Sequence, residues 1–264
     1  MPAPASPLYA AQEASAVSRW PEIAGLLRSL AIYHGQPHRT WARRRFYRDF
    51  VKPGDLCFDI GAHVGNHIRA WRALGARTVA LEPNPRFFAL LERVYGKRQD
   101  VTLLQQAVGA SPGAAELHLS ARTPTVSSLS PDWIAAVKRA PAFAGVSWDT
   151  ALPVTVTTLD DLIARFGPPD FCKIDIEGFE AEALAGLSQP IRQLSFEYLP
   201  AAKAPAQASI ERLSALGPYS FNVSRGETMR LIFPVWIGAE DLSAWLRELD
   251  PNAPSGDVYA RLSG

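Results

Sequence analysis

Short apolar runs alternate with segments of helical periodicity along most of this chain. Residues 56–60 form one such run, and an amphipathic stretch at 66–74 follows it. A second run at 78–82 leads into a helical stretch that begins with Asn84 and Pro85, the residue types of an N-cap and a first helical position. Nearly continuous apolar strands that alternate with helices predict an α/β fold, with a mostly parallel sheet covered on both faces.

The same alternation continues to the C-terminus. We expect a third strand at 101–109, an extra strand beside it at 114–120, and a helix that begins with a capping box of Thr158 and Asp161. The last strands lie close together in the sequence, which predicts an antiparallel edge. The remaining predicted strands are 170–178, 193–199, 219–224, 229–236 and 256–262, and the remaining helices are 179–187, 209–217 and 239–249.

The chain divides into a tail, a lead-in and one domain. Residues 1–20, rich in Ala, Pro and Ser, predict a disordered tail, and 21–50 predict a helical lead-in. The domain then spans 51–264, because 264 residues with 47% hydrophobic content suffice for one well-buried core. Within it, 120–152 does not fit the alternation, and we interpret this segment as a lid or acceptor-binding insertion.

Two interpretations of the aromatic residues in this insertion stay open. Trp133, Phe143 and Trp148 either stack on a sugar or apolar acceptor, or pack on one another as a small separate core. The basic run Arg43-Arg44-Arg45 lies among aromatic residues at helical spacing, so we expect an amphipathic helix there, not a phosphate-binding patch.

Charge and cysteine content exclude several classes of partner. Lys and Arg number 27 against 26 Asp and Glu, so no overall field favours nucleic acid or an anionic membrane. Cys57 and Cys172 lie inside apolar runs, where two thiols do not make a disulfide framework. We see no signal peptide and no run long enough to span a bilayer. We therefore expect a cytoplasmic protein with no integral membrane segment and no nucleic-acid partner.

The loop after the first predicted strand, "DIGAHVG" at 59–65, is the place where an open parallel sheet binds ligands. A dinucleotide fingerprint needs G-x-G-x-x-G, but His63 occupies the position of the second glycine. NAD and FAD are therefore disfavoured. What remains is Asp59 at the loop and Glu82, 21 residues after Gly61, at the separation from which a carboxylate commonly reaches ribose hydroxyls.

A nucleoside without a pyrophosphate suits this pair of carboxylates. S-adenosylmethionine would place its cationic amino-acid end near Asp59 and its ribose near Glu82. In the simpler alternative, Asp59 caps the following helix and Glu82 is a solvated strand end.

Five stretches, in order and spacing, resemble the FkbM-type family of S-adenosylmethionine-dependent methyltransferases: "VKPGDLCFDIGAHVGNH", "VALEPNP", "LQQAVGASPGAAELHLS", "VTTLDDLI" and "DFCKIDIEGFEAEALAGL". The resemblance covers about residues 51–200. It implies a Rossmann-like class I methyltransferase fold, a seven-stranded sheet with the last strand antiparallel. It also implies methylation of a hydroxyl on a sugar, glycan or secondary metabolite, so that the partner is a small-molecule or glycan acceptor.

The resemblance also assigns the cofactor contacts by position. Asp59, Gly61 and Gly65 would line the methionine end, with Ala62 in the same loop, Glu82 would bind the ribose, and Ala107 and Val108 would contact the adenine. This sequence departs from commoner members at His63 and His67, so either histidine is open to a ligand role.

Carboxylates after the fourth main strand are the candidates for catalysis. Lys173, Asp175 and Glu177 share one side of the strand, and a buried strand cannot carry three charges through its middle, so they mark its carboxyl end. Asp175 and Glu177 lead as the base or orienting group for the acceptor, followed by His63 and Glu197. The alternative, in which Lys173 simply pairs with Asp175 at the strand end, also stays open.

Other chemistries are less favoured. A carboxylate cluster also suits Mg²⁺, but the spacing is no metal signature, so we predict no metal. The competing functions are an NAD(P)-dependent oxidoreductase and a non-catalytic cofactor-binding protein.

Overall fold

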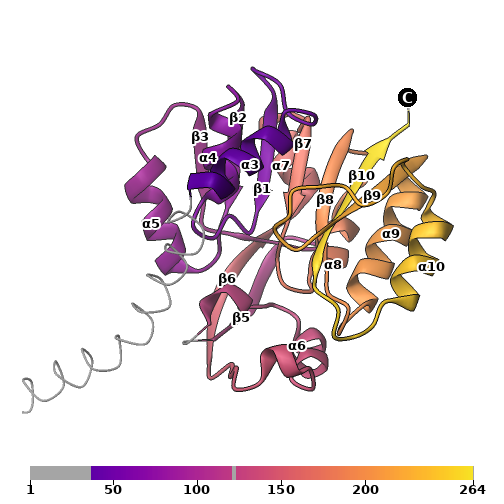
Figure 1. Ribbon diagram of the computed structural model, residues 1–264. Helices are drawn as coiled ribbons and strands as arrows, with labels where there is room; N and C mark the ends of the chain where they lie inside the picture. The colour runs from indigo at the N-terminus through magenta and orange to yellow at the C-terminus, as the bar shows by residue number, and fades with distance from the viewer. Residues whose placement is uncertain (1–36, 121–122, 264) are drawn as a thin grey trace, which may run out of the picture.

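A seven-stranded sheet with helices on both faces forms the centre of the protein (Figure 1). The computed structural model describes residues 37–120 and 123–263. The predicted tail at 1–20 and the first part of the predicted lead-in, up to residue 36, lie outside the described residues.

The strand order of this sheet is β3-β2-β1-β7-β8-β10-β9. Strands β1, β2, β3, β7 and β8 are parallel, and the last strand, β10, runs antiparallel to both neighbours. This confirms the predicted Rossmann-like arrangement, with β10 one position in from the edge strand β9. The strands are β1 Leu56–Ile60, β2 Arg77–Leu81, β3 Val101–Leu104, β7 Phe171–Ile174, β8 Gln193–Tyr198, β9 Tyr219–Arg225 and β10 Gly256–Leu262.

Alternating side chains of the strands divide the core into two layers. Phe58 and Ile60 pack in the core that includes α7 Leu159–Phe166, α8 Glu180–Ala185, α9 Ala204–Leu216 and α10 Ala239–Glu248. Cys57 points the other way, into a core with α3 Pro37–Tyr47 and α4 Asn66–Arg72, and α5 Pro85–Tyr95 covers the same face beside them. No helix in the described ranges is both long enough and apolar enough to cross a membrane.

Local capping explains where two helices begin. The Asn84 side chain accepts a hydrogen bond from the N–H of Arg86, with Pro85 in the first helical position of α5. Thr158 and Asp161 form the predicted capping box of α7. These contacts were visible in the sequence because they join residues only two or three positions apart.

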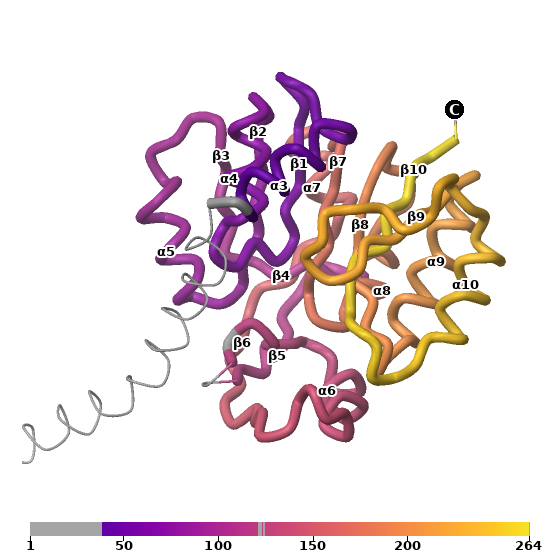
Figure 2. The backbone as a smooth tube through the Cα atoms, viewed as in Figure 1, coloured from indigo at the N-terminus to yellow at the C-terminus, as the bar shows by residue number. Residues whose placement is uncertain are grey.

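The predicted third strand proves to be two strands in different sheets. Strand β3 ends at Leu104, and β4 Ala107–Val108 belongs to a second sheet of order β4-β6-β5 (Figure 2). The extra strand expected beside it, β5 Gly113–Leu119, instead pairs antiparallel with β6 Thr150–Thr157. The segment 229–236 makes only an isolated bridge between Leu231 and Ser224, not the predicted strand.

The predicted insertion lies between β5 and β6 of the second sheet. It contains helix α6 Pro131–Val137 and two short 3₁₀ turns, η1 Pro124–Val126 and η2 Pro141–Phe143. Trp133, Phe143 and Trp148 pack on one another with ring centroids 5.7 to 6.5 Å apart. The structure therefore supports the separate-core interpretation of these aromatic residues.

Gly61 should be the least replaceable glycine of the fold. A Cβ there would lie 2.0 Å from the backbone oxygen of Asp175, and its φ of +86° already disfavours other residues. Gly54 has a similar φ of +90° but no atom within 4 Å of the added Cβ. We expect Gly54→Ala to cost about 1 kcal/mol of unfolding free energy, from backbone strain alone, and Gly61→Ala at least about 2 kcal/mol more, from the clash. Urea denaturation of both variants measures this difference, and equal losses would contradict it.

Candidate active site

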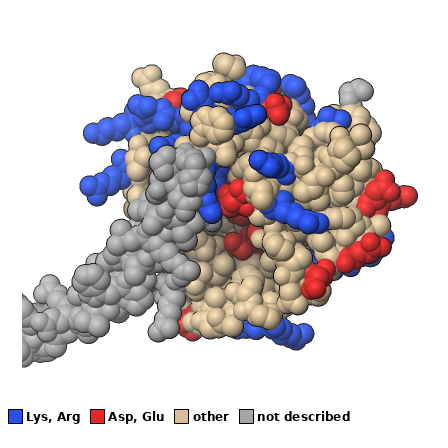
Figure 3. Space-filling view, viewed as in Figure 1, with Lys and Arg blue, Asp and Glu red and all other residues tan. Residues whose placement is uncertain are grey.

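A cleft opens at the carboxyl ends of β1, β2 and β7, where the strand order reverses between β1 and β7. Its empty volume is about 890 Å³, including the part open to solvent. In Figure 3, acidic side chains lie in a hollow near the centre of the face shown, with basic side chains close by. Because it lies at the carboxyl ends of the strands, the cleft occupies the usual ligand position of an open parallel sheet.

Most of the predicted site residues line this cleft, and some do not. The residues that line it are Gly61, His63, Glu82, Ala107, Val108, Asp175 and Glu177. Asp59 and Ala62 are almost completely buried beneath it, and Gly65 faces helix α5. Glu197 lines a second cavity next to the first. The structure thus brings together seven of the eleven predicted residues in one cavity.

The two glycines of the first loop are needed for packing within the protein. The space beside Gly61 is filled by the backbone of Asp175, so that the loops after β1 and β7 touch. A Cβ on Gly65 would lie 2.7 Å from the ring of Tyr95, whose hydroxyl donates a hydrogen bond to the Gly65 carbonyl at 3.2 Å. Of the two, only Gly61 also forms part of the cleft wall.

His63 has a structural explanation that the sequence did not provide. Its backbone is left-handed, with φ of +49°, and its N–H donates a hydrogen bond of 2.8 Å to Oε2 of Glu82. Its ring meets the Phe87 ring edge-on, with centroids 4.0 Å apart. The histidine therefore joins the first loop to the end of β2 and to α5.

Glu82 is held at the cleft by two backbone donors. Besides the His63 contact, its Oε1 accepts a hydrogen bond of 2.9 Å from the N–H of Asn84. Burial raises the pKa of Glu82 to about 7, against the lowering effect of the two N–H groups. Glu82 is therefore a fixed carboxylate at the cleft wall, not a solvated strand end.

Asp59 lies behind the cleft wall, on the face covered by α3 and α4. Its side chain is fully buried, and within the described residues neither carboxylate oxygen has a hydrogen-bond partner. Nδ1 of His67 is 3.6 Å from Oδ1, and the His67 ring stacks on Trp71. Asp59 is thus too deep to line the cleft, and His67 is a packed histidine beside it that also reaches the cleft.

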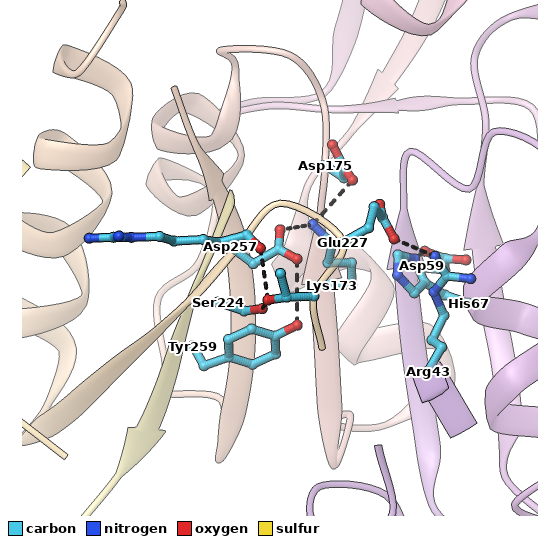
Figure 4. Close-up of polar contacts among 11 residues, drawn as sticks. Arg43, Asp59, His67, Lys173, Asp175, Ser224, Glu227, Asp257 and Tyr259 are labelled. Carbon is cyan, nitrogen blue, oxygen red and sulfur yellow. Dashed lines mark hydrogen bonds and ion pairs between the residues drawn. The ribbon is translucent and has the colours of Figure 1, made fainter. Parts of the chain in front are cut away.

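Lys173 is a buried cation between two aspartates (Figure 4). Its Nζ is 2.7 Å from Oδ1 of Asp257 on β10 and 3.1 Å from Oδ2 of Asp175. Burial lowers the pKa of Lys173, but Asp175 and Asp257 outweigh it and hold the pKa well above its usual value. The predicted pairing of Lys173 with Asp175 is therefore present, and a third group that sequence analysis missed completes it.

Three carboxylates converge at the ends of β7 and β8. Oxygens of Asp175, Glu177 and Glu197 lie within 4.8 Å of one another, close enough to surround a cation. Burial raises the pKa of Asp175, but Lys173 outweighs it and lowers the pKa below its usual value. Burial and the charge of Asp175 hold the pKa of Glu177 well above its usual range, and burial and Glu177 do the same for Glu197.

The backbone around Glu177 is strained and closely supported. Its φ of +53° is unfavourable for a residue with a side chain. Oε1 of Glu180 accepts hydrogen bonds from the N–H groups of Ile176 and Gly178, and the Ser128 hydroxyl donates to the Glu177 carbonyl at 2.6 Å. Glu180, in the first turn of α8, thus also fixes the loop that carries Glu177.

A second cavity shares Glu177 with the cleft. It is lined by residues of the insertion between Thr123 and Val146, by Glu197 and by the segment 251–255. Most of these side chains are apolar, and the described lining residues include no lysine or arginine. Glu177 therefore stands where the two spaces meet.

The sequence model of the methyltransferase FkbM domain matches residues 59–214, which is more than half of the chain. The chain belongs to the FkbM methyltransferase family. Its cofactor is S-adenosyl-L-methionine, and the match decides against the NAD(P)-dependent oxidoreductase that the glycine loop had left as an alternative. The sequence matches none of the curated proteins.

Solved structures of several methyltransferases are similar to this FkbM protein at low identity. A TehB-like S-adenosylmethionine-dependent methyltransferase from Corynebacterium glutamicum is 10% identical, with 96% of this chain and 99% of that chain covered and a TM-score of 0.47. An O-methyltransferase from Bacillus cereus is 12% identical, with 90% of each chain covered and a TM-score of 0.45. A precorrin-6y C5,15-methyltransferase from Geobacter metallireducens is 16% identical, with 83% and 87% covered and a TM-score of 0.42.

Several cleft residues of the FkbM protein were missed by sequence analysis. Phe87 belongs to the helix predicted after Asn84, and Ser127 to the insertion that does not fit the alternation. Glu227 lies in the loop after β9, far from any motif. Asn84 was recognised as an N-cap, and its place two residues after Glu82 was the one signal that pointed to the cleft.

Proposed function

We propose that this FkbM protein transfers a methyl group from S-adenosylmethionine to a hydroxyl oxygen of a sugar, glycan or secondary metabolite. The observation that carries the proposal is Glu177, a carboxylate of raised pKa that lines both the cleft and the second cavity. An alcohol needs its proton removed as it attacks, and a base with a pKa near the working pH does this best.

The cleft residues fit the cofactor. Each Glu82 oxygen already accepts one backbone hydrogen bond, and each has lone-pair capacity left for a ribose hydroxyl. Ala107 and Val108 offer an apolar surface to the adenine, and Gly61 gives the amino-acid end access to the loop backbone. Asp59 is too deep for direct contact, so the sequence-based assignment of the cationic end to this residue is not part of the proposal.

Two carboxylates with opposite pKa shifts take different roles. S-adenosylmethionine supplies the activated methyl group on its sulfonium. Glu177 accepts the proton of the acceptor hydroxyl, because its raised pKa makes it the stronger base. Asp175 stays charged beside Lys173 and orients the acceptor. Glu197 completes the wall on the acceptor side, and His63, held by Glu82 and Phe87, shapes the cofactor side.

The second cavity is the proposed acceptor site, and the insertion at 120–152 its wall. Phe143 and Leu199 give an apolar surface, whereas Glu177 and Glu197 provide the polar end. Because no described lining residue is basic, this cavity favours an uncharged hydroxyl compound with an apolar face over a phosphorylated or sulfated one.

Cofactor affinity should depend on pH through Glu82. Its pKa of about 7 leaves it increasingly protonated below neutrality, and the protonated form loses an acceptor for the ribose diol. We expect S-adenosylhomocysteine affinity to fall about tenfold between pH 8 and pH 6. Glu82→Gln should bind weakly at every pH, because its amide N–H₂ would face the N–H of His63 or Asn84. Calorimetry across this range tests the assignment, and a flat profile for the wild type would contradict it.

Methyl transfer should require Glu177. A screen of cell extracts and hydroxylated compounds with tritiated S-adenosylmethionine identifies an acceptor, and the variants are then compared on it. We expect Glu177→Gln to lower kcat about 10²- to 10⁴-fold with S-adenosylhomocysteine affinity unchanged. The wild-type rate should fall as the pH drops through the raised pKa of Glu177, because the base becomes protonated.

Asp175→Asn should also lower kcat, and Glu182→Gln, an exposed carboxylate on the same helix-loop unit, serves as the matched control. If turnover survives the changes at both Glu177 and Asp175, these carboxylates do not carry the chemistry.

Methyl transfer should not require a divalent metal. Lys173 already compensates the charge of Asp175, and the raised pKa values of Glu177 and Glu197 oppose the full ionisation that a divalent cation needs from its ligands. We therefore expect incubation with EDTA, followed by desalting, to leave the rate unchanged. A loss of rate that Mg²⁺ restores would show that the three carboxylates hold a metal instead.

A further inference from the structure

Glu227 brings a carboxylate to the cleft from a part of the chain outside the family match. It lies in the loop between β9 and α10, beyond the matched residues 59–214, yet it lines the cleft together with Asn66 and His67. Its side chain is 42% exposed, so the carboxylate is accessible to a ligand.

A buried arginine of the lead-in helix fixes this carboxylate. Nη2 of Arg43, on α3, donates a hydrogen bond of 2.5 Å to Oε2 of Glu227, and the Arg43 side chain is only 3% exposed. Figure 4 shows Glu227 directed toward Arg43, near Asp59 and His67. Within the basic run of this helix, Arg43 points inward, whereas Arg44 and Arg45 are exposed.

The loop that carries Glu227 is itself anchored. The N–H of Gly226 donates to the carbonyl of Ser255 at 2.7 Å, and Leu231 forms a bridge with Ser224. Met229 and Trp236 pack against the core formed with α3. The Glu227 carboxylate is therefore held at the cleft by Arg43 and by the contacts that anchor its loop.

We infer that Glu227 binds the α-ammonium group of S-adenosylmethionine and that Arg43 is its positioning residue. The inference rests on the proposed placement of the cofactor. Asp59 is fully buried and outside the cleft lining, and Asp175 is already paired with Lys173. Glu227 uses only Oε2 in the Arg43 contact, and among the described residues its Oε1 has no hydrogen-bond partner. A carboxylate with one oxygen bound and the other available can accept a hydrogen bond from an ammonium group. The contact with Arg43 keeps the Glu227 carboxylate in place at the cleft.

Calorimetry with three ligands tests this assignment. S-adenosylhomocysteine carries the ammonium, its deaminated butanoate analogue lacks only that group, and 5′-methylthioadenosine lacks the whole amino-acid end. We expect Glu227→Gln to weaken S-adenosylhomocysteine binding about tenfold or more, and to leave the affinities for the other two ligands within about twofold. Glu211→Gln, which removes an exposed carboxylate from the middle of α9, should change none of the three affinities.

A second variant tests the role of Arg43. Arg43→Met should also weaken S-adenosylhomocysteine selectively, and the Arg43→Met/Glu227→Gln double variant should lose no more than the larger single loss. Equal affinity of Glu227→Gln and wild type for S-adenosylhomocysteine overturns the inference, as does an equal loss for all three ligands. If the wild type itself does not bind S-adenosylhomocysteine, the proposed cofactor placement fails instead.

Discussion

The buried ammonium of Lys173 is the interaction on which the rest of the site depends. Taking an isolated charge out of water costs several kcal/mol, so a lysine inside a central strand must be paired. Asp257 comes from the antiparallel strand β10, and Asp175 from the end of the parallel strand β7. One cation therefore joins strand β10 to the loop that carries the proposed catalytic groups, and removing the ammonium of Lys173 would leave two neighbouring aspartates without their counter-charge.

The charge of Lys173 also gives the neighbouring carboxylates different pKa values. Asp175 is close enough to be kept ionised, whereas Glu177 and Glu197 receive mainly the effects of burial and of like charge. Identical chemical groups thus obtain opposite pKa shifts within a few ångströms. This separation of acid strengths is what allows one carboxylate to orient an acceptor while another removes its proton.

Strained backbone in the cleft coincides with the residues that face it. His63 and Glu177 both have positive φ values, and each is held by hydrogen bonds from a neighbouring element. Such conformations cost of order 1–3 kcal/mol and persist only where the surroundings enforce them. The loops after β1 and β7 also touch at Gly61, so the two halves of the cleft support one another.

Local sequence determined the alternation of strands and helices, the caps at Asn84 and Thr158, and the carboxylates at the strand ends, because these features depend on neighbours a few residues apart. The separation of Glu82 from Gly61 indicated its place at the cleft, and the family resemblance added a seven-stranded sheet with an antiparallel last strand. Only the tertiary structure showed that β5 pairs with β6, that Asp59 lies beneath the cleft and that Gly65 serves helix α5.

The contacts of Lys173 with Asp257 and of Arg43 with Glu227 join residues 84 and 184 positions apart. No periodicity or spacing in the sequence encodes such pairs. They arise from the sheet register and from the packing of α3 against the loop after β9, which only the folded chain fixes.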